Sequence, residues 1–480
     1  MSLIIPANTL ASGGYEVANS VRLNDGSSDY FNRTPGSATN QKTFTISMWV
    51  KRGELGSSNG LLLQGVNSGN NDFAIYFTSA DKLQTFSWSG GSKQFQVDTQ
   101  RVFRDVSAWY HIVFVADTTQ GTDSNRIKIY INGVQETALE NVTYPSVNAD
   151  LEYNDTSALW VGRSYGGNYF DGYMAEVVSA DGTALTPTDF GEFDEDSGIW
   201  KPISVSGLTF GTNGFYLDFE DSGALGDDVS GNGNDFTVNN LTAIDQSTDT
   251  CTNNFATLNP LKILGTATTS FEEGNLQFNS TNSNWANTFS TIAFSQGKWY
   301  AEFKVITLAS STGYGSAGIA DVNDADDNSS ASTINVNSES AGVIFDYRSG
   351  QSALKSATSS VTSNIGNFSA NDIVGMAVDM DNRALYVHLN GTYYQISSVT
   401  GVPTSGASKT GAITIPTSVI DCAFTVGSYT DKSETAVNFG SPPYSESGGE
   451  TDGNGYGNFA HAVPSGYLSL CTKNLSEVLG

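Results

Sequence analysis

Ile-Lys-Ile-Tyr-Ile-Asn-Gly-Val-Gln at residues 127–135 decides the fold class, and Leu-Tyr-Val-His-Leu-Asn-Gly-Thr-Tyr-Tyr at 385–394 repeats its pattern. In each stretch, apolar residues alternate along a strand that runs into Asn-Gly, and a second short strand follows. Asn and Gly tolerate the positive φ angles of a two-residue turn, so each stretch is predicted to form a β-hairpin. Another apolar strand precedes each hairpin, at 109–117 and 372–379. Two copies so far apart predict two β-domains in tandem.

Length and composition agree with this prediction. A chain of 480 residues can form two or three domains with substantial cores. Its 50 glycines and 11% aromatic residues are typical of all-β structure with many turns. No long segment shows the spacing of an amphipathic helix. The predicted fold class is therefore all-β, with tandem antiparallel β-sandwiches.

The charge of the chain excludes two kinds of partner. Fifty acidic residues outnumber 22 basic ones, for a net charge of −28. This charge repels phosphate backbones and anionic lipids, so we expect neither nucleic-acid binding nor membrane insertion. The start of the chain, 1–6, has no basic region and no long apolar core, so synthesis in the cytoplasm without a signal peptide is expected. Cys251, Cys422 and Cys471 form no close pair, which argues against a disulfide framework or zinc spacing.

The first predicted domain spans 14–200 and follows an N-terminal arm, 1–13. Its strand at 43–50 alternates cleanly, as a sheet of a sandwich should. Further landmarks follow in order: Ser20–Leu23, Asp29-Tyr30, Trp109-Tyr110-His111, Tyr130-Ile131-Asn132-Gly133, Val161-Gly162 and Phe170–Glu176. In this series the domain resembles the laminin-G/pentraxin-like domains of the concanavalin A-like lectin class. The resemblance implies a jelly roll that recognises ligands.

Residues 201–268 are expected to form a connecting β segment with a hinge at 248–260. The acidic loop at 227–236 resembles a segment near the start of many laminin-G-like domains. The connection could therefore be a donated piece of sheet rather than a linker.

The last predicted domain spans 269–442. Its opening Gly297-Lys298-Trp299-Tyr300 and its closing Asn438-Phe439-Gly440 resemble a SPRY domain, a bent β-sandwich that recognises partners through its loops. The tail, 443–480, is expected to pack on this SPRY-like domain through a final strand near Tyr467 to Cys471.

The whole arrangement resembles virion proteins of tailed bacteriophages, in particular marine ones. The resemblance implies an exterior appendage such as a tail fibre, with a host cell-surface glycan or protein and other virion proteins as partners. For a fibre, a homo-oligomer and specifically a trimer is expected. The alternative is a structural protein that decorates the capsid or tail and binds neighbouring subunits.

A glycan-degrading enzyme is the least favoured class. Jelly rolls that cleave glycans carry Glu-x-Asp-x-x-Glu on one strand, where alternation brings carboxylates together. Glu192-Phe193-Asp194-Glu195-Asp196-Ser197 is the nearest match, and it lacks the third carboxylate. His111 and His388 lie within apolar strands, so both are interpreted as packing residues. We expect a protein without catalytic activity.

Calcium is the one ion for which the sequence offers candidate ligands, since it takes carboxylate, amide and carbonyl oxygens from loops. The first cluster comprises Asp227, Asp228, Asn232, Asn234 and Asp235. The second comprises Asp321, Asn323, Asp324, Asp326, Asp327 and Asn328. Neither follows EF-hand spacing, and solvated turns capped by their own side chains are the alternative for both.

Sugar binding requires an aromatic plate against the apolar sugar face and polar groups for the hydroxyls. Tyr165, Asn168 and Tyr169 supply both on one glycine-rich loop. In the SPRY-like domain, Tyr347, Arg348 and Tyr429 are expected on loops that follow strands. The tryptophans are expected in the cores, namely Trp49, Trp109, Trp160 and Trp299.

Overall fold

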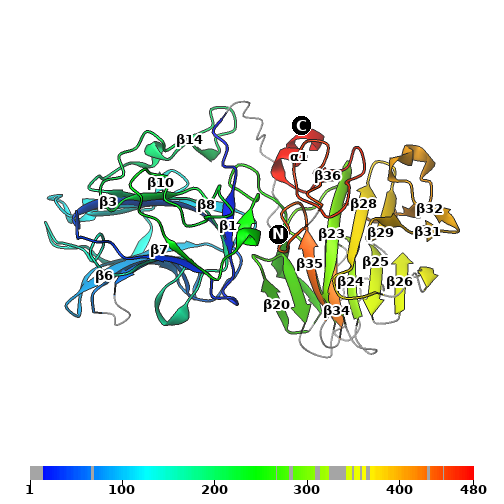
Figure 1. The fold of residues 1–480 in the computed structure, drawn as a ribbon, viewed down its shortest axis with the longest axis horizontal. Helices are drawn as coiled ribbons and strands as arrows, with labels where there is room; N and C mark the ends of the chain where they lie inside the picture. Colours follow the sequence, from blue (N-terminus) through cyan, green and yellow to red (C-terminus); the bar gives the residue numbers. More distant parts are fainter. Residues whose placement is uncertain are drawn as a thin grey trace. The chain divides into compact units, whose positions relative to one another are not determined.

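The computed structural model describes residues 14–65, 70–265, 267–280, 285–308, 314–323, 342–348, 351–356, 359–363, 368–429, 433–446 and 448–479. The chain divides into two compact units, an N-terminal unit (Leu10–Asn254) and a C-terminal unit that starts at Phe255. Each unit contains two large sheets made almost entirely of antiparallel strand pairs (Figure 1). The prediction of an all-β fold with tandem sandwiches is confirmed.

The N-terminal unit contains sheets A and B, whose strands are listed here in spatial order. Sheet A is β10 (Val134–Gln135), β9 (Ile127–Ile131), β8 (Trp109–Asp117), β3 (Thr43–Arg52), β13 (Gly172–Asp181), β1 (Ser20–Leu23) and β18 (Gln246–Ser247), with β16 (Phe215–Leu217) paired to β13. Sheet B is β11 (Leu139–Thr143), β7 (Ser92–Val102), β6 (Lys82–Ser89), β5 (Asp72–Phe77), β4 (Asn59–Gly65), β12 (Leu159–Val161), β2 (Tyr30–Arg33) and β17 (Thr237–Asn239). In Figure 1, β3 and β8 lie in one layer and β6 and β7 in the other.

Alternation along the strands builds the core between these sheets. Phe44 and Ile46 of β3 face inward and are buried against Phe73 and Ile75 of β5 and Val161 of β12. Burial of such side chains contributes roughly 1.5–3 kcal/mol each. The inner faces of both sheets are thereby removed from water.

The outer face of sheet A is also covered. Phe190, Val205 and Phe210, from the segment after β13, pack on Val113 and Val178 of that face. Next to them, further residues from outside the sheet, including Val17 and Trp200, pack on Trp49, Trp109 and Tyr173. Both faces of sheet A are therefore buried within this unit.

The boundary between the units differs from the expected connecting segment at 201–268. Strand β16 pairs with β13, β17 with β2 and β18 with β1, so 201–254 completes the sheets of the N-terminal unit. These short strands find partners because β13, β2 and β1 would otherwise present unpaired backbone groups. The division falls between Asn254 and Phe255.

The C-terminal unit contains sheets C and D. Sheet C is, in spatial order, β19 (Leu258–Gly265), β22 (Trp285–Ser290), β34 (Cys422–Tyr429), β24 (Tyr314–Asp321), β25 (Gly342–Arg348), β26 (Gln351–Ser356) and β27 (Ser359–Ser363). Sheet D is β20 (Thr269–Glu272), β21 (Gln277–Ser280), β35 (Glu434–Asn438), β23 (Lys298–Thr307), β28 (Ile373–Asp379), β29 (Ala384–Leu389) and β30 (Thr392–Tyr393), with β33 (Ile413–Thr414) on β29 and β36 (Leu468–Ser469) on β23. Their core contains Trp299, Phe303, Val374 and Phe424.

The C-terminal tail returns to sheet D. Strand β36 pairs in parallel with β23, and helix α1 (Thr472–Leu479) buries Leu475 in the core. The fully buried carboxylate of Glu302 accepts hydrogen bonds from the backbone N–H groups of Ala460 and His461, both at 2.9 Å. Its burial raises the pKa of Glu302 to about 7. In the described part of the chain, no helix has the length and apolar character needed to cross a bilayer.

One turn device occurs in both units. Asn132 and Asn390 have φ angles of 48° and 49°, and the glycines that follow them have φ angles of 80° and 81°. Positive φ at both central residues defines the hairpin turn that the sequence predicts. The side chain of Asn132 also accepts a hydrogen bond from the His111 N–H at 2.8 Å, and Asn390 accepts one from the Ile373 N–H at 2.8 Å.

We predict that Asn132→Val and Asn390→Val each destabilise their own unit by about 1–3 kcal/mol, because a β-branched residue resists positive φ and cannot accept the hydrogen bond. Differential scanning calorimetry of the whole chain is the measurement. The matched controls are Asn132→Gly and Asn390→Gly, because they keep the turn and lose only the hydrogen bond of the side chain. They should lower the free energy of unfolding less than the valine variants do. Unchanged transitions in the valine variants would contradict the prediction.

Candidate functional site

Three aromatic rings surround one arginine just beyond the end of strand β12 of sheet B. The guanidinium carbon of Arg163 lies 4.5 Å from the ring centroid of Trp160, 4.9 Å from Tyr30 and 5.3 Å from Tyr169. The rings of Tyr30 and Tyr169 are 5.9 Å apart. Each such contact contributes roughly 0.5–2 kcal/mol, depending on exposure. We call these four residues the aromatic cluster.

The strands place the cluster on the outer face of sheet B. In β12, Leu159 and Val161 point into the core, so Trp160 between them points outward. In β2, Phe31 faces the core and Tyr30 faces outward in the same way. All four side chains of the cluster are partly exposed.

Glycines bring the cluster's loop close to the sheet. Gly162 has a φ of 81°, which turns the chain out of β12. A Cβ on Gly60 of β4 would lie 2.1 Å from the Ser164 backbone nitrogen, so only glycine allows this approach. The loop closes on itself through a hydrogen bond from the Ser164 N–H to the Asn168 carbonyl at 2.8 Å.

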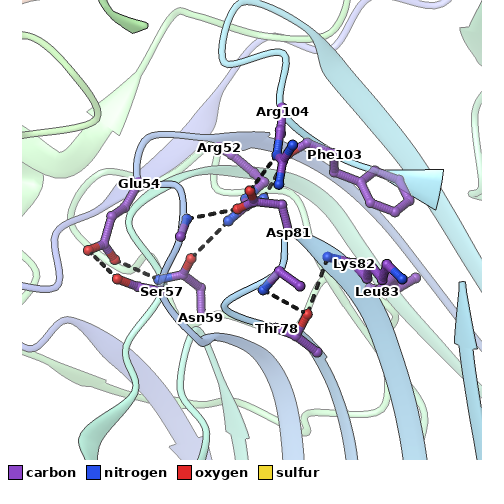
Figure 2. A network of polar contacts seen from close by, with 12 residues as sticks. Arg52, Glu54, Ser57, Asn59, Thr78, Asp81, Lys82, Leu83, Phe103 and Arg104 are labelled. Atoms are coloured by element: carbon purple, nitrogen blue, oxygen red, sulfur yellow. Dashed lines mark hydrogen bonds and ion pairs between the residues drawn. The ribbon is translucent and has the colours of Figure 1, made fainter. Parts of the chain in front are cut away.

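A buried ion pair is connected to this loop by hydrogen bonds. Arg52, which is fully buried, donates to Asp81 at 3.1 Å and to the Asn59 side chain at 3.2 Å (Figure 2). Asn59 in turn donates to Glu54 at 2.9 Å and to the Tyr169 carbonyl at 3.3 Å. These bonds link the end of β3 to the backbone of Tyr169.

The outer face of sheet B continues from Trp160 as a second apolar patch. Trp160 lies opposite Leu63, which lies opposite Ala74, which lies opposite Phe86. The partly buried rings of Tyr76 and Trp88 pack on this row. All members of the patch come from sheet B itself, so no other described segment of the N-terminal unit contributes to its apolar packing.

A polar network borders the patch. The buried carboxylate of Asp98 accepts hydrogen bonds from the side-chain amides of Gln84, Gln96 and Asn141 at 2.8–2.9 Å. Tyr76 donates to Gln84 within the same network. The face therefore combines aromatic rings with amide groups, the two kinds of group that hold a sugar.

The three residues predicted on the glycine-rich loop have different outcomes. Tyr169 belongs to the aromatic cluster and Asn168 is exposed. Tyr165 begins a short turn, Tyr165–Gly167, and its side chain lies outside the described residues. The sequence analysis missed Tyr30 and Arg163, and it assigned Trp160 to the core. The signal was present, since Trp160 and Tyr30 each adjoin core residues on a strand that alternates.

The described candidates in the C-terminal unit lie on strands rather than on loops. Tyr347 is not on a loop: it lies within β25, is fully buried and bonds through its hydroxyl to Thr435. The backbone of Arg348 ends the same strand, and its side chain lies outside the described residues. Tyr429 ends β34, half-buried, with its ring 6.3 Å from that of Tyr314. The strand extends further than predicted, and this places Tyr347 on the core side with Val343.

Residues of the first acidic cluster form hydrogen bonds with one another and with nearby backbone groups. Asp228 accepts hydrogen bonds from the N–H groups of Tyr216 and Asn234, at 2.9 and 2.8 Å, and Asp235 accepts one from the Asp228 N–H at 3.0 Å. Asn232 and Asn234 both donate to the Gly214 carbonyl. No described group of three His, Cys, Asp or Glu residues is arranged to hold a metal ion. These contacts are those of capped turns.

The described residues of the rest of that cluster and of the second cluster also form hydrogen bonds within the chain. Asp227 donates its backbone N–H to Ala224. In the second cluster, Asp321 accepts from the N–H groups of Asn323 and Asp421 at 2.8 and 2.9 Å. Asp324, Asp326, Asp327 and Asn328 lie outside the described residues.

The segment considered for glycan cleavage forms a separate hairpin. Glu192 lies in β14 (Gly191–Phe193), which pairs with β15 (Trp200–Pro202) and with neither main sheet. Lys201 contacts both Glu192, at 3.3 Å, and Asp194, at 3.2 Å. Hydrogen bonds from Ser197, together with Lys201, lower the pKa of Asp194 to about 2. Both carboxylates are thus engaged within the hairpin.

Both strand histidines are buried. His111 accepts a hydrogen bond from the Trp200 indole at Nδ1, 2.9 Å away, and its Nε2 lies 2.8 Å from the Ser47 hydroxyl. His388 lies 2.7 Å from the Tyr300 hydroxyl and accepts from the Gly391 N–H at 3.1 Å. Burial lowers the pKa of each imidazole to about 3, so both are neutral near pH 7.

Residues 25–189 match the model of the Concanavalin A-like lectin/glucanases superfamily. No curated protein matches the chain. Among solved structures, the SPRY domain of human HERC1 is 12% identical, with 38% of this chain and 96% of that chain covered at a TM-score of 0.28. Domains LG4-5 of the mouse laminin alpha1 chain are 7% identical, with coverages of 87% and 82% and a TM-score of 0.29. The SAP-like pentraxin of Limulus polyphemus is 12% identical, with coverages of 36% and 80% and a TM-score of 0.26.

The match with this superfamily covers most of the strands of sheets A and B. It begins before Tyr30 and ends after Tyr169, so it includes the whole aromatic cluster. The match agrees with the jelly-roll fold of the N-terminal unit.

Because His111 is buried, we predict that the free energy of unfolding of the N-terminal unit depends on pH. Its folded pKa lies below the unfolded value of 6.5, so its stabilisation is complete above pH 6.5 and is lost as the pH falls toward 3. Glu176, whose pKa burial raises from 4.5 to about 7, acts in the opposite sense and loses its stabilisation as the pH rises through that range. We therefore compare the wild type with His111→Gln by urea unfolding. Between pH 6.5 and 4.5, the wild type should lose about 2 kcal/mol more than the variant. Parallel stability curves would contradict this assignment.

Proposed function

We propose that the N-terminal unit binds a glycan on the outer face of sheet B, and that the chain is a non-enzymatic appendage protein of a phage virion, such as a tail fibre. The observation that carries the binding proposal is the aromatic cluster on the outer face of sheet B, where the apolar patch of the described residues is packed by side chains of sheet B alone. On this view, the cluster recognises a glycan of the host cell surface.

The chemistry of the face suits a sugar. A pyranose has an apolar C–H face that stacks on aromatic rings, and the half-exposed rings of Trp160 and Tyr169 provide such plates. Hydroxyl groups need donors and acceptors at fixed positions, and the amides of Gln84 and Gln96, held by Asp98, supply these beside Tyr76. A preformed surface of this kind binds without a large cost in ordering its side chains.

The carboxylates on this face support binding rather than hydrolysis. Asp98 accepts bonds from three amides, and Glu140, opposite it on β11, pairs with Lys82 at 2.7 Å. Glycosidases need one carboxylate that donates a proton and a second that attacks or activates water. Side chains held by these partners are suited to orienting sugar hydroxyls.

The virion assignment is supported by the resemblance of the domain order to phage appendage proteins. A tandem of two β-sandwiches suits an exterior protein, since each presents loops and faces to partners. In the virion we expect a homo-oligomer, with a trimer favoured for a fibre. Immunogold labelling of purified particles would test this assignment, and label confined to the capsid would favour the decorating role instead.

Trp160→Ala and Tyr169→Ala should each weaken glycan binding about tenfold or more, because interfaces depend on a few large aromatic contacts. A glycan array with the purified chain selects the ligand, and isothermal titration calorimetry measures its affinity. Phe193→Ala is the matched control, since Phe193 is 49% exposed on the separate β14 hairpin. Glycan binding that survives both cluster variants would refute the site. If the wild type binds no glycan and the two cluster variants fail to assemble into particles, the decorating role would be favoured.

A further inference from the structure

Arg163 is half-buried and has no anionic partner among the described residues, whereas several other cations of the N-terminal unit are paired with a carboxylate. Arg52 pairs with Asp81 at 3.1 Å, Lys51 with Asp249 at 2.7 Å and Lys82 with Glu140 at 2.7 Å. Arg163 makes neither an ion pair nor a hydrogen bond with any described residue; its contacts are the three rings of the cluster. In a chain with 50 acidic residues, an unpaired guanidinium on a binding face calls for an explanation.

The way Arg163 is held leaves its hydrogen-bonding capacity unused. The rings lie around the guanidinium carbon, and ring contacts of this kind use the flat faces of the group rather than its N–H groups. The Nε atom is buried and has no acceptor among the described residues, a state that ordinarily costs about 1–3 kcal/mol. A guanidinium presents its N–H groups as a fork that matches the two oxygens of a carboxylate or sulfate.

We propose that Arg163 selects saccharides that carry an anionic group, a carboxylate or a sulfate, and places the sugar ring against Tyr30 and Tyr169. This inference rests on the proposed function, because it assigns the ligand class of the same face. The chain as a whole carries −28 charges and repels anions. Selection of an anionic sugar must therefore come from a local contact, and Arg163 is placed to make it.

A purely structural role for Arg163 makes a different prediction. If the arginine only holds the three rings in position, its replacement should weaken neutral and anionic sugars alike. If it contacts an anion, its replacement should remove the preference for anionic sugars and leave the affinity for neutral ones nearly unchanged.

The test is calorimetric titration of the whole chain with three probes of similar length: oligogalacturonate, a sulfated galactan oligosaccharide and a neutral galactan oligosaccharide. The variants are Arg163→Gln, which removes the charge, and Arg163→Lys, which keeps the charge and loses the fork. Lys128→Gln is the matched control, because Lys128 lies half-buried on β9 of sheet A and its loss changes the net charge equally. Thermal unfolding verifies that each variant is folded.

We expect the wild type and Lys128→Gln to bind at least one anionic probe more tightly than the neutral one. Arg163→Gln should reduce that affinity about ten- to a hundredfold, as expected for hydrogen bonds to a charged group, and should change the neutral affinity less than twofold. The probe that loses affinity identifies carboxylate or sulfate. Arg163→Lys should retain part of the preference, and it remains informative if Arg163→Gln does not fold. Equal binding of all three probes, or a preference that survives Arg163→Gln, would overturn this inference and leave the proposed function intact. Failure of every saccharide to bind would overturn both.

Discussion

A β-sheet has two faces, and the N-terminal unit buries both faces of sheet A but only the inner face of sheet B. The segment after β13 supplies Phe190, Val205 and Phe210 for the outer face of sheet A. Burial of these apolar side chains stabilises the unit, and both faces of sheet A are used for packing. Sheet B keeps aromatic side chains on its outer face that its own strands only partly bury. The functional proposal follows from this asymmetry.

A binding face also needs fixed side chains, and here the fixation comes from buried polar contacts. Arg52 is buried at a desolvation cost, which Asp81 and Asn59 offset through charge-assisted hydrogen bonds. The same contacts reach the Tyr169 carbonyl through Asn59. A core ion pair is thus connected by hydrogen bonds to the backbone of a residue of the aromatic cluster.

Local rules predicted the parts of this fold that local geometry determines. The Asn-Gly turns at 132 and 390 and the alternation at 43–50 follow from φ preferences and from the period of a strand. The extent of the N-terminal unit was not predictable in this way, because the pairing of β16 with β13 and of β17 with β2 joins segments far apart in sequence. Tyr347 shows the same limit, since its burial depends on where β25 ends.

The candidate site was predicted in part for a related reason. Tyr169 could be proposed from a glycine-rich loop, whereas Tyr30 and Trp160 join it only through the pairing of β2 with β12. Arg163 gave no sign in the sequence, because its distinguishing property is the absence of an acidic partner in space. The calcium hypothesis stays a prediction, because Asp and Asn are suited both to binding Ca²⁺ and to capping turns, and Asp228 accepts backbone N–H groups.

The most direct test of the central claim is hydrogen–deuterium exchange of the intact chain with and without a glycan that it binds. The account predicts slower exchange at β2, at β12 and in the loop from Gly162 to Phe170, with sheet A and the C-terminal unit unchanged. Protection confined to sheet A or to the C-terminal unit, with β12 and its loop unaffected, would contradict it.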